Sequence, residues 1–224
     1  MKGVPLAGTG VACDTHSVRH GERAVSAGRR DAGARPVTST REAVLDAALA
    51  TFTERTYGGT SMAQVAERAG VAVGSIYRHF PSKEALGNAV YLRWKRQVTE
   101  DVEREVDPGA PTREAFGQLW RVLTRFATTN PDAFAFLEHQ QHEEYLDGES
   151  RALSERLWAI AIDILVRGQR AGAVRSTDPM VLLAVAYGAL VGVDKALRTG
   201  QTGSAEPFAD AEAAIWDMLR APSS

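Results

Sequence analysis

Few side chains in this 224-residue chain have the types and spacing that catalysis needs. His139 and His142 lie three residues apart beside Glu138 and Glu143, a spacing that could ligate a metal ion. A polar pocket wall or a solvated face is the interpretation we prefer for this pair. Cys13 is the single cysteine and the one candidate nucleophile, and the sequence contains no Gly-rich phosphate loop and no G-x-S-x-G motif. We therefore expect no enzyme activity, no bound metal and no cofactor.

A second group of residues has types suited to binding nucleic acid. Small and polar side chains follow a glycine turn at Gly70 and occupy a segment that can form only two turns of helix before Phe80 and Pro81. Two short helices joined by a tight glycine turn describe a helix-turn-helix, whose second helix lies in the major groove of DNA. Ile76 and Phe80 are expected to face inward from this second helix.

Capping signals place the helices that would position these residues. Ser39 to Glu42 has the S-x-x-E form of a capping box, and Ser61 to Gln64 reads as a second one. Ser82 is a good N-cap for a longer helix that ends near Val106. These signals and the apolar spacing predict helices at about 40–55, 62–69, 73–79 and 83–106.

The residues Tyr57 to Val71, followed by Gly74 to Leu86, closely resemble the DNA-binding domain of the TetR family over about residues 39–90. The resemblance implies that Thr60 and Ser61 bind phosphate at the start of the second helix. It also implies that Tyr77 and His79 contact the DNA backbone and that Lys83 reaches phosphate. The full set of expected DNA contacts is Thr60, Ser61, Val73, Gly74, Ser75, Tyr77, Arg78, His79 and Lys83. Alternatively, Tyr77 only packs, Arg78 and Lys83 are merely solvated, or the whole motif is a structural hairpin.

Two positions depart from the family pattern. Ala72 stands where the family often has a polar cap, which forfeits about 1 kcal/mol of helix stability. Val73 stands where a basic or polar side chain is common, and it can offer only apolar contact, for example to a thymine methyl group. Base reading would then rest on few side chains and on DNA shape.

The rest of the chain has helical periodicity and no alternating strand pattern. Helices are expected at about 112–129, 131–146, 150–171, 179–197 and 207–219. The predicted fold is all-α, with an N-terminal three-helix DNA-binding domain at 39–96 and a helical ligand-binding and dimerisation domain at 97–224. Residues 1–38, rich in Gly, Ala, Arg and Ser, are expected to be a disordered basic tail.

Large and polar side chains in the second domain could line a pocket for a largely apolar effector, although each could equally be plain core. The candidates are Phe116, Trp120, Phe126, Phe134, His139, His142, Tyr145 and Trp158.

Small residues recur every four positions in the helix from Pro179, which would let two helices approach closely. We expect this helix and the last one to pair with their copies in a two-fold four-helix bundle, with packing within one chain as the alternative. The expected contacts are Ala184, Tyr187, Gly188, Val191, Gly192, Ile215, Trp216 and Leu219.

Charge is unevenly distributed along the chain. Residues 39–96 carry eight basic and five acidic side chains, whereas residues 97–224 carry twelve and twenty. The single cysteine fits a reducing compartment, and the apolar run Val181–Val193 is too short to span a bilayer. The N-terminus also has no continuous apolar signal region. We expect a cytoplasmic protein that does not enter the membrane.

Together these observations predict a homodimeric transcriptional regulator, most simply a repressor, that binds a palindromic operator in double-stranded DNA and is released by a small molecule. The alternative is a helical module that binds a small molecule or a protein and whose helix-turn-helix is non-functional.

Overall fold

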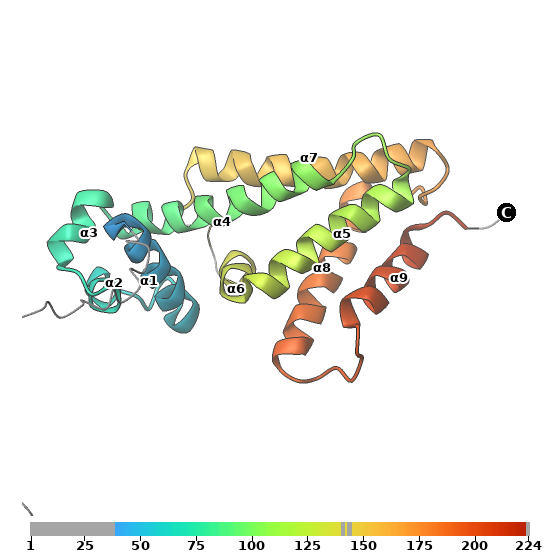
Figure 1. Ribbon diagram of the computed structural model, residues 1–224. Helices are drawn as coiled ribbons and strands as arrows, with labels where there is room; N and C mark the ends of the chain where they lie inside the picture. Colours follow the sequence, from blue (N-terminus) through green and yellow to red (C-terminus); the bar gives the residue numbers. More distant parts are fainter. Residues whose placement is uncertain (1–38, 140–141, 143–144, 223–224) are drawn as a thin grey trace, which may run out of the picture. The chain divides into compact units, whose positions relative to one another are not determined.

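The computed structural model describes residues 39–139, 142 and 145–222, and the tail expected at 1–38 lies outside them. The described residues form helices joined by turns, with one isolated backbone bridge between Val174 and Arg220. The all-α prediction is therefore confirmed. The helices (Figure 1) are α1 (Thr40–Arg55), α2 (Met62–Ala69), α3 (Val73–His79), α4 (Lys83–Glu105), α5 (Thr112–Thr129), α6 (Pro131–His139), α7 (Gly148–Arg170), α8 (Pro179–Arg198) and α9 (Pro207–Leu219).

Local capping explains where the first helices begin and end. The Ser61 hydroxyl accepts the Gln64 backbone N–H at 3.3 Å, and the Gln64 side chain accepts the Ser61 N–H at 2.8 Å, which completes the predicted capping box of α2. Gly70 ends α2 with φ of +67°, a left-handed conformation that glycine adopts without steric cost. α3 starts at Val73 with no side-chain cap from Ala72, as predicted.

α4 is shared by both halves of the chain. Leu86 and Val90 are buried in the same core cluster as α1, α2 and α3, while Val102 is buried in a second cluster with residues of α5 and α7. The helix runs without a break through the boundary expected at residue 96, and it packs along α7 (Figure 1). The two halves are therefore joined by a continuous helix.

A buried amide fixes α4 against the start of α7. The Asn88 Oδ1 atom accepts the Asp147 N–H at 2.9 Å and the Ser150 hydroxyl at 3.0 Å, and its Nδ2 atom donates to the Tyr145 carbonyl. Because a buried amide is costly when its hydrogen bonds are unmade, this arrangement specifies one register between the two helices.

The predicted helix at 131–146 is wrong in its second half, because α6 ends at His139. The His142 Nε2 atom lies 2.7 Å from the Phe136 carbonyl oxygen, and its Nδ1 atom lies 2.5 Å from the Tyr145 hydroxyl. In a continuing helix that carbonyl would instead accept a backbone N–H four residues further on. The His142 imidazole thus lies within hydrogen-bond distance of a carbonyl in the last turn of α6.

α8 is long and apolar enough, by length and composition alone, to be a candidate membrane span among the described residues. The 13-residue run Val181–Val193 includes only the uninterrupted apolar residues, so it is shorter than the apolar helix Pro179–Arg198. A core helix of a soluble protein meets the same criteria, and α8 buries Leu182, Ala186 and Leu190 in the protein core. A single such helix is weak support for a membrane span.

Restoring the missing cap of α3 tests this local account. Ala72→Ser should raise the free energy of unfolding by about 1 kcal/mol, because Ala72 already has the extended backbone of an N-cap and lacks only the hydroxyl acceptor. Urea denaturation of the full chain measures the change. Ala214→Ser, on the exposed face of α9, is the control and should be neutral or slightly destabilising. Equal stability of Ala72→Ser and the wild type would contradict the account.

Candidate functional site

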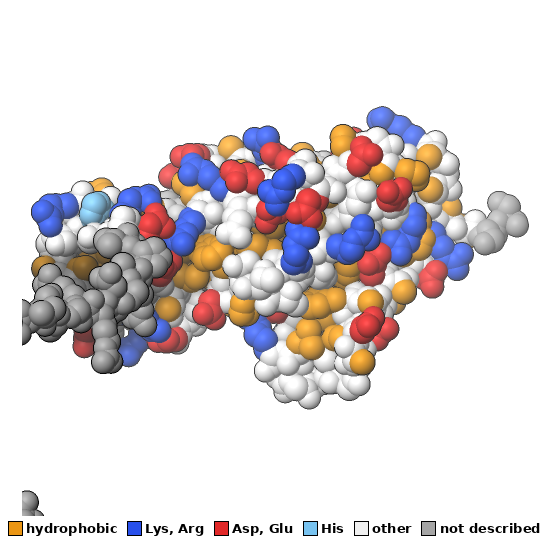
Figure 2. All heavy atoms as spheres, viewed as in Figure 1, with side chains coloured by type: hydrophobic (Ala, Val, Ile, Leu, Met, Phe, Trp, Pro, Cys, Tyr) orange, Lys and Arg blue, Asp and Glu red, His pale blue; other side chains and the backbone are white. Residues whose placement is uncertain are grey.

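α3 buries one side and exposes the other. Ile76 and Phe80 anchor the helix in the core, whereas Val73 and Tyr77 are 40% and 49% exposed. Gly74, Arg78 and His79 are also exposed, and Ser75 is half-buried. Figure 2 shows Lys and Arg side chains at this end of the described chain. The helix thus presents a mixed apolar and basic surface to its surroundings.

Two features of the α3 surface would allow a binding partner to approach the helix closely. They are the lack of a side chain at Gly74 and the position of the Arg78 guanidinium. A Cβ built on Gly74 meets no atom within 4 Å, so the protein's own packing does not require glycine there. Glycine inside a helix is about 1 kcal/mol less stable than alanine. The Arg78 Nη2 atom donates to the Ser75 hydroxyl at 2.9 Å, which holds the guanidinium along the exposed face.

Hydrogen bonds within the protein engage three of the expected phosphate contacts to different degrees. These are Thr60, Ser61 and Lys83. Thr60 is buried, and its hydroxyl donates to the Thr56 carbonyl at 2.9 Å, so a phosphate contact from this hydroxyl is not favoured. Ser61 is exposed beside the first N–H groups of α2. The Lys83 Nζ atom donates to the Thr60 carbonyl at 2.9 Å and lies 4.4 Å from the Tyr57 ring centre, so one of its three donors is engaged. Lys83 therefore ties α4 to the turn before α2.

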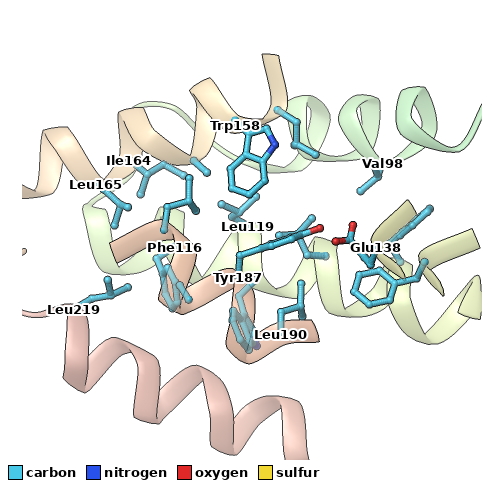
Figure 3. Close-up of a pocket in the computed structure, with 18 of the residues that line it drawn as sticks. Val98, Phe116, Leu119, Glu138, Trp158, Ile164, Leu165, Tyr187, Leu190 and Leu219 are labelled. Atoms are coloured by element: carbon cyan, nitrogen blue, oxygen red, sulfur yellow. The ribbon is translucent and has the colours of Figure 1, made fainter. Parts of the chain in front are cut away.

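A second feature is a cavity of about 80 Å³ lined by residues of α4 to α9. Phe116, Trp120, Phe126, Phe134 and Trp158, predicted as pocket residues, all line it. Leu183, Ala186 and Leu190 of α8 also line it, and these three were not among the predicted pocket residues. Figure 3 shows these side chains converging from several helices.

One end of the cavity is polar, and its residues Lys95, Glu138 and Tyr187 were not among the predicted pocket residues. Lys95 is only 7% exposed, and burial lowers the pKa of its ammonium while the nearby Glu138 carboxylate opposes that shift. Burial, followed by the charge of Glu138 and a hydrogen bond to it, raises the pKa of the Tyr187 hydroxyl well above its usual value. In Figure 3 the Tyr187 hydroxyl points toward the Glu138 carboxylate. The available signal was a lysine on the same helix face as Tyr91 and Val98.

His142 and Tyr145 do not line the cavity, which corrects that expectation. Tyr145 stacks on Tyr57 with ring centres 4.0 Å apart, and His142 is held between the Phe136 carbonyl and the Tyr145 hydroxyl. Burial lowers the pKa of the His142 imidazole. His139 ends α6, and its side chain lies outside the described part of the chain.

The alternative that His139 and His142 form a helical pair of metal ligands finds no support among the described residues. His142 is not on a helix with His139, and both of its ring nitrogens are engaged in hydrogen bonds. Within residues 39–139, 142 and 145–222 there is no group of three or more potential metal ligands.

The expected dimer contacts divide into exposed and buried sets. Ala184, Gly188 and Gly192 are exposed on α8, and Val191 is half-buried. Beside them lie three large exposed apolar residues, Met180, Val181 and Val185. None of the three was among the expected dimer contacts, although they follow the same helical spacing. α8 therefore exposes a continuous apolar face in the isolated chain.

Four expected contacts face inward instead. Ile215 and Leu219 are buried, and Leu219 and Tyr187 line the cavity. Trp216 is half-buried and packs on Phe116 with ring centres 5.8 Å apart. Their helical spacing placed them on apolar faces correctly. The face of α9 packs against this chain's own α5 and α8, and Tyr187 packs on Trp158 of α7 with ring centres 5.2 Å apart.

Comparison with known proteins agrees with this architecture. Residues 44–90 match the family described as "Bacterial regulatory proteins, tetR family", and residues 91–221 match "Tetracyclin repressor-like, C-terminal domain". The second match alone covers more than half of the chain.

Curated relatives match part of this chain. The chain is 46% identical over 66 residues to the transcriptional regulator RutR of Escherichia coli K12, which covers 30% of this chain and 29% of that protein. It is 43% identical over 108 residues to the transcriptional repressor KstR of Rhodococcus jostii, covering 48% and 50%. The matched stretches thus span half or less of these relatives.

Solved structures share the whole fold at low identity. A TetR family transcription regulator from Marinobacter aquaeolei matches with a TM-score of 0.71 and 21% identity, over 82% of this chain and 97% of that one. The regulator PfmR from Thermus thermophilus matches with a TM-score of 0.65 and 24% identity, over 81% and 99%. With the helix-turn-helix geometry and both domain matches, these findings show that the chain belongs to the TetR family of DNA-binding transcriptional regulators.

Proposed function

We propose that this regulator is a repressor that binds a palindromic operator as a homodimer and leaves it when a small molecule fills the apolar cavity. The observation that carries the proposal is α3, which is anchored by Ile76 and Phe80 and exposes Val73 and Tyr77 on its other face. A helix held in this way can enter a major groove without losing its own packing.

The exposed side chains on and near α3 are suited to contact either the phosphates or the bases of the operator. Tyr77, Arg78 and His79 can donate to phosphates, which position the protein on DNA without reading its sequence. Val73 can contact a thymine methyl group. Ser61 and the remaining donors of Lys83 can reach phosphate at the edge of this surface, whereas the buried Thr60 hydroxyl is left out.

The exposed apolar face of α8 supports a homodimer. Ala184, Gly188 and Gly192 lie beside Val181 and Val185, so a second copy of α8 could approach closely and cover the face. A two-fold dimer would present two copies of α3 to half-sites about 34 Å apart or a multiple of that distance. Such a protein would act in the cytoplasm, where bacterial DNA is found.

The size of the cavity supports a switch. A volume of about 80 Å³ is well below the roughly 300–1,000 Å³ of typical ligand pockets. An effector would therefore have to move the surrounding helices apart. α4 contributes Lys95 and Val98 to the cavity and also carries the buried anchors of α1 to α3, so its displacement would change the separation of the two α3 helices.

The DNA-binding proposal is tested with the full chain. Genome fragments selected by the wild type supply the operator, and fluorescence anisotropy measures its affinity. Tyr77→Ala should weaken binding by roughly tenfold or more, since a hydrogen bond to a charged phosphate is lost. Affinity of the wild type should fall steeply with added salt as counterions are released. Glu155→Ala on the exposed face of α7 is the control. Enrichment of no fragment at any salt concentration would favour the module with a non-functional helix-turn-helix.

Charge on the α8 face tests the homodimer. Val185→Glu should raise the dimer dissociation constant by about a hundredfold or more, because the carboxylate would be buried in an apolar interface and would face its own copy. Analytical ultracentrifugation measures the change, and circular dichroism checks the fold. Val73→Glu, equally exposed but on α3, should remain dimeric. If both variants associate like the wild type, α8 is not the interface.

Filling the cavity tests the switch without knowing the effector. Ala186→Leu adds bulk to the cavity wall and should imitate a bound ligand, weakening operator binding by roughly tenfold while the protein stays folded and dimeric. Ala213→Leu, exposed on α9, should leave operator affinity unchanged. Wild-type affinity in Ala186→Leu would mean that expansion of the cavity is not transmitted to α3.

A further inference from the structure

The cavity is amphipathic in a specific way. Its apolar wall includes aromatic side chains from four helices, and its polar groups gather at one end. Lys95 comes from α4. Glu138 comes from α6 and Tyr187 from α8 (Figure 3). A ligand that fits this wall would have an apolar body and one polar end.

The opposite charges in the cavity wall restrict the net charge that the polar end of a ligand can carry. Among the described residues that line the cavity, Lys95 and Glu138 are the two charged side chains, and their charges are opposite and close enough to interact. A charged ligand would disturb this balance and leave one buried charge without compensation, which is unfavourable in a site of low dielectric constant. An uncharged ligand leaves the balance intact.

The hydrogen-bonding capacity of Lys95 and Glu138 indicates which functional group the ligand carries at its polar end. The Lys95 ammonium can only donate, and the Glu138 carboxylate can only accept. A hydroxyl group can satisfy both, because its oxygen accepts from Lys95 while its proton is donated to Glu138. A carbonyl group could accept from Lys95 but would offer Glu138 nothing.

The shape of the wall indicates the body of the ligand. Six aromatic side chains line the cavity, and aromatic rings pack well edge-to-face against one another. The volume of about 80 Å³ is smaller than the roughly 150 Å³ of a cavity known to bind benzene. A body built on one ring therefore suits the site with limited parting of the helices. The aromatic residues are Phe116, Trp120, Phe126, Phe134, Trp158 and Tyr187.

We infer that the effector class is an uncharged aromatic alcohol or phenol, whose ring lies among the aromatic side chains and whose hydroxyl bridges Lys95 and Glu138 beside Tyr187. This inference rests on the proposed function, in that it takes the cavity as the effector site.

Three probes with the same apolar body test the inference by calorimetry on the full-length protein at neutral pH. They are para-propylphenol, which is neutral with a hydroxyl, propylbenzene, which has no polar end, and para-propylbenzoate, which is an anion. The phenol should bind about tenfold or more tightly than either of the others, since it alone makes hydrogen bonds to charged groups without adding charge. Tighter binding of the benzoate, equal binding of propylbenzene, or binding of none of the three would overturn the inference.

A charge variant makes the test sharper. Glu138→Gln removes the negative charge that balances Lys95, so its preference should reverse toward the benzoate by about tenfold. Glu155→Gln, an exposed carboxylate on α7, should keep the wild-type order of affinities. An unchanged preference in a folded Glu138→Gln protein would also refute the inference, and if that variant does not fold, the three wild-type affinities still decide.

These measurements are independent of DNA. Operator binding is measured without any ligand, so a protein that binds the operator but none of the probes refutes the ligand class alone. A protein that binds the phenol but no DNA refutes the repressor instead.

Discussion

α4 buries side chains in both halves of the chain at once, and the remaining arrangement depends on this shared packing. Leu86 and Val90 hold α1 to α3, while Val98 lines the cavity and Val102 packs among residues of α5 and α7. Because close-packed interiors transmit displacement rather than absorb it, neither half can move along α4 without disturbing the other. The buried Asn88 amide adds a polar constraint, since sliding α4 past α7 would break its hydrogen bonds together.

The polar end of the cavity contains a buried charge, which destabilises the folded protein unless other groups compensate it. Lys95 would be more stable in water, and burial lowers the pKa of its ammonium. Glu138 compensates part of this cost from a different helix, and Tyr187 hydrogen-bonds to Glu138 from a third. Polar groups gathered in this way inside an apolar wall are typical of ligand sites, where they orient a bound molecule.

The hydropathy of α8 alone does not distinguish a membrane span from a helix that packs against another helix. Its length and composition are those of a membrane span, yet one side of the helix is buried in the protein core. The other side combines small residues with exposed Val181 and Val185. Small residues flanked by large apolar ones favour close packing against another helix, as the proposed homodimer would require.

The sequence by itself determined the class of fold, the ends of most helices and the buried side of α3. Capping by Ser61 and Gln64, the left-handed turn at Gly70 and the inward spacing of Ile76 and Phe80 involve residues only a few positions apart, so they can be read along the chain. Only the tertiary structure decided which apolar faces stay exposed and which polar groups meet. α6 ends where His142 reaches back to the Phe136 carbonyl. Leu219 faces the cavity rather than a partner, and the polar end of the cavity combines residues from three helices. Periodicity indicates that a helix has an apolar face, but the identity of what covers that face depends on packing between segments far apart in sequence.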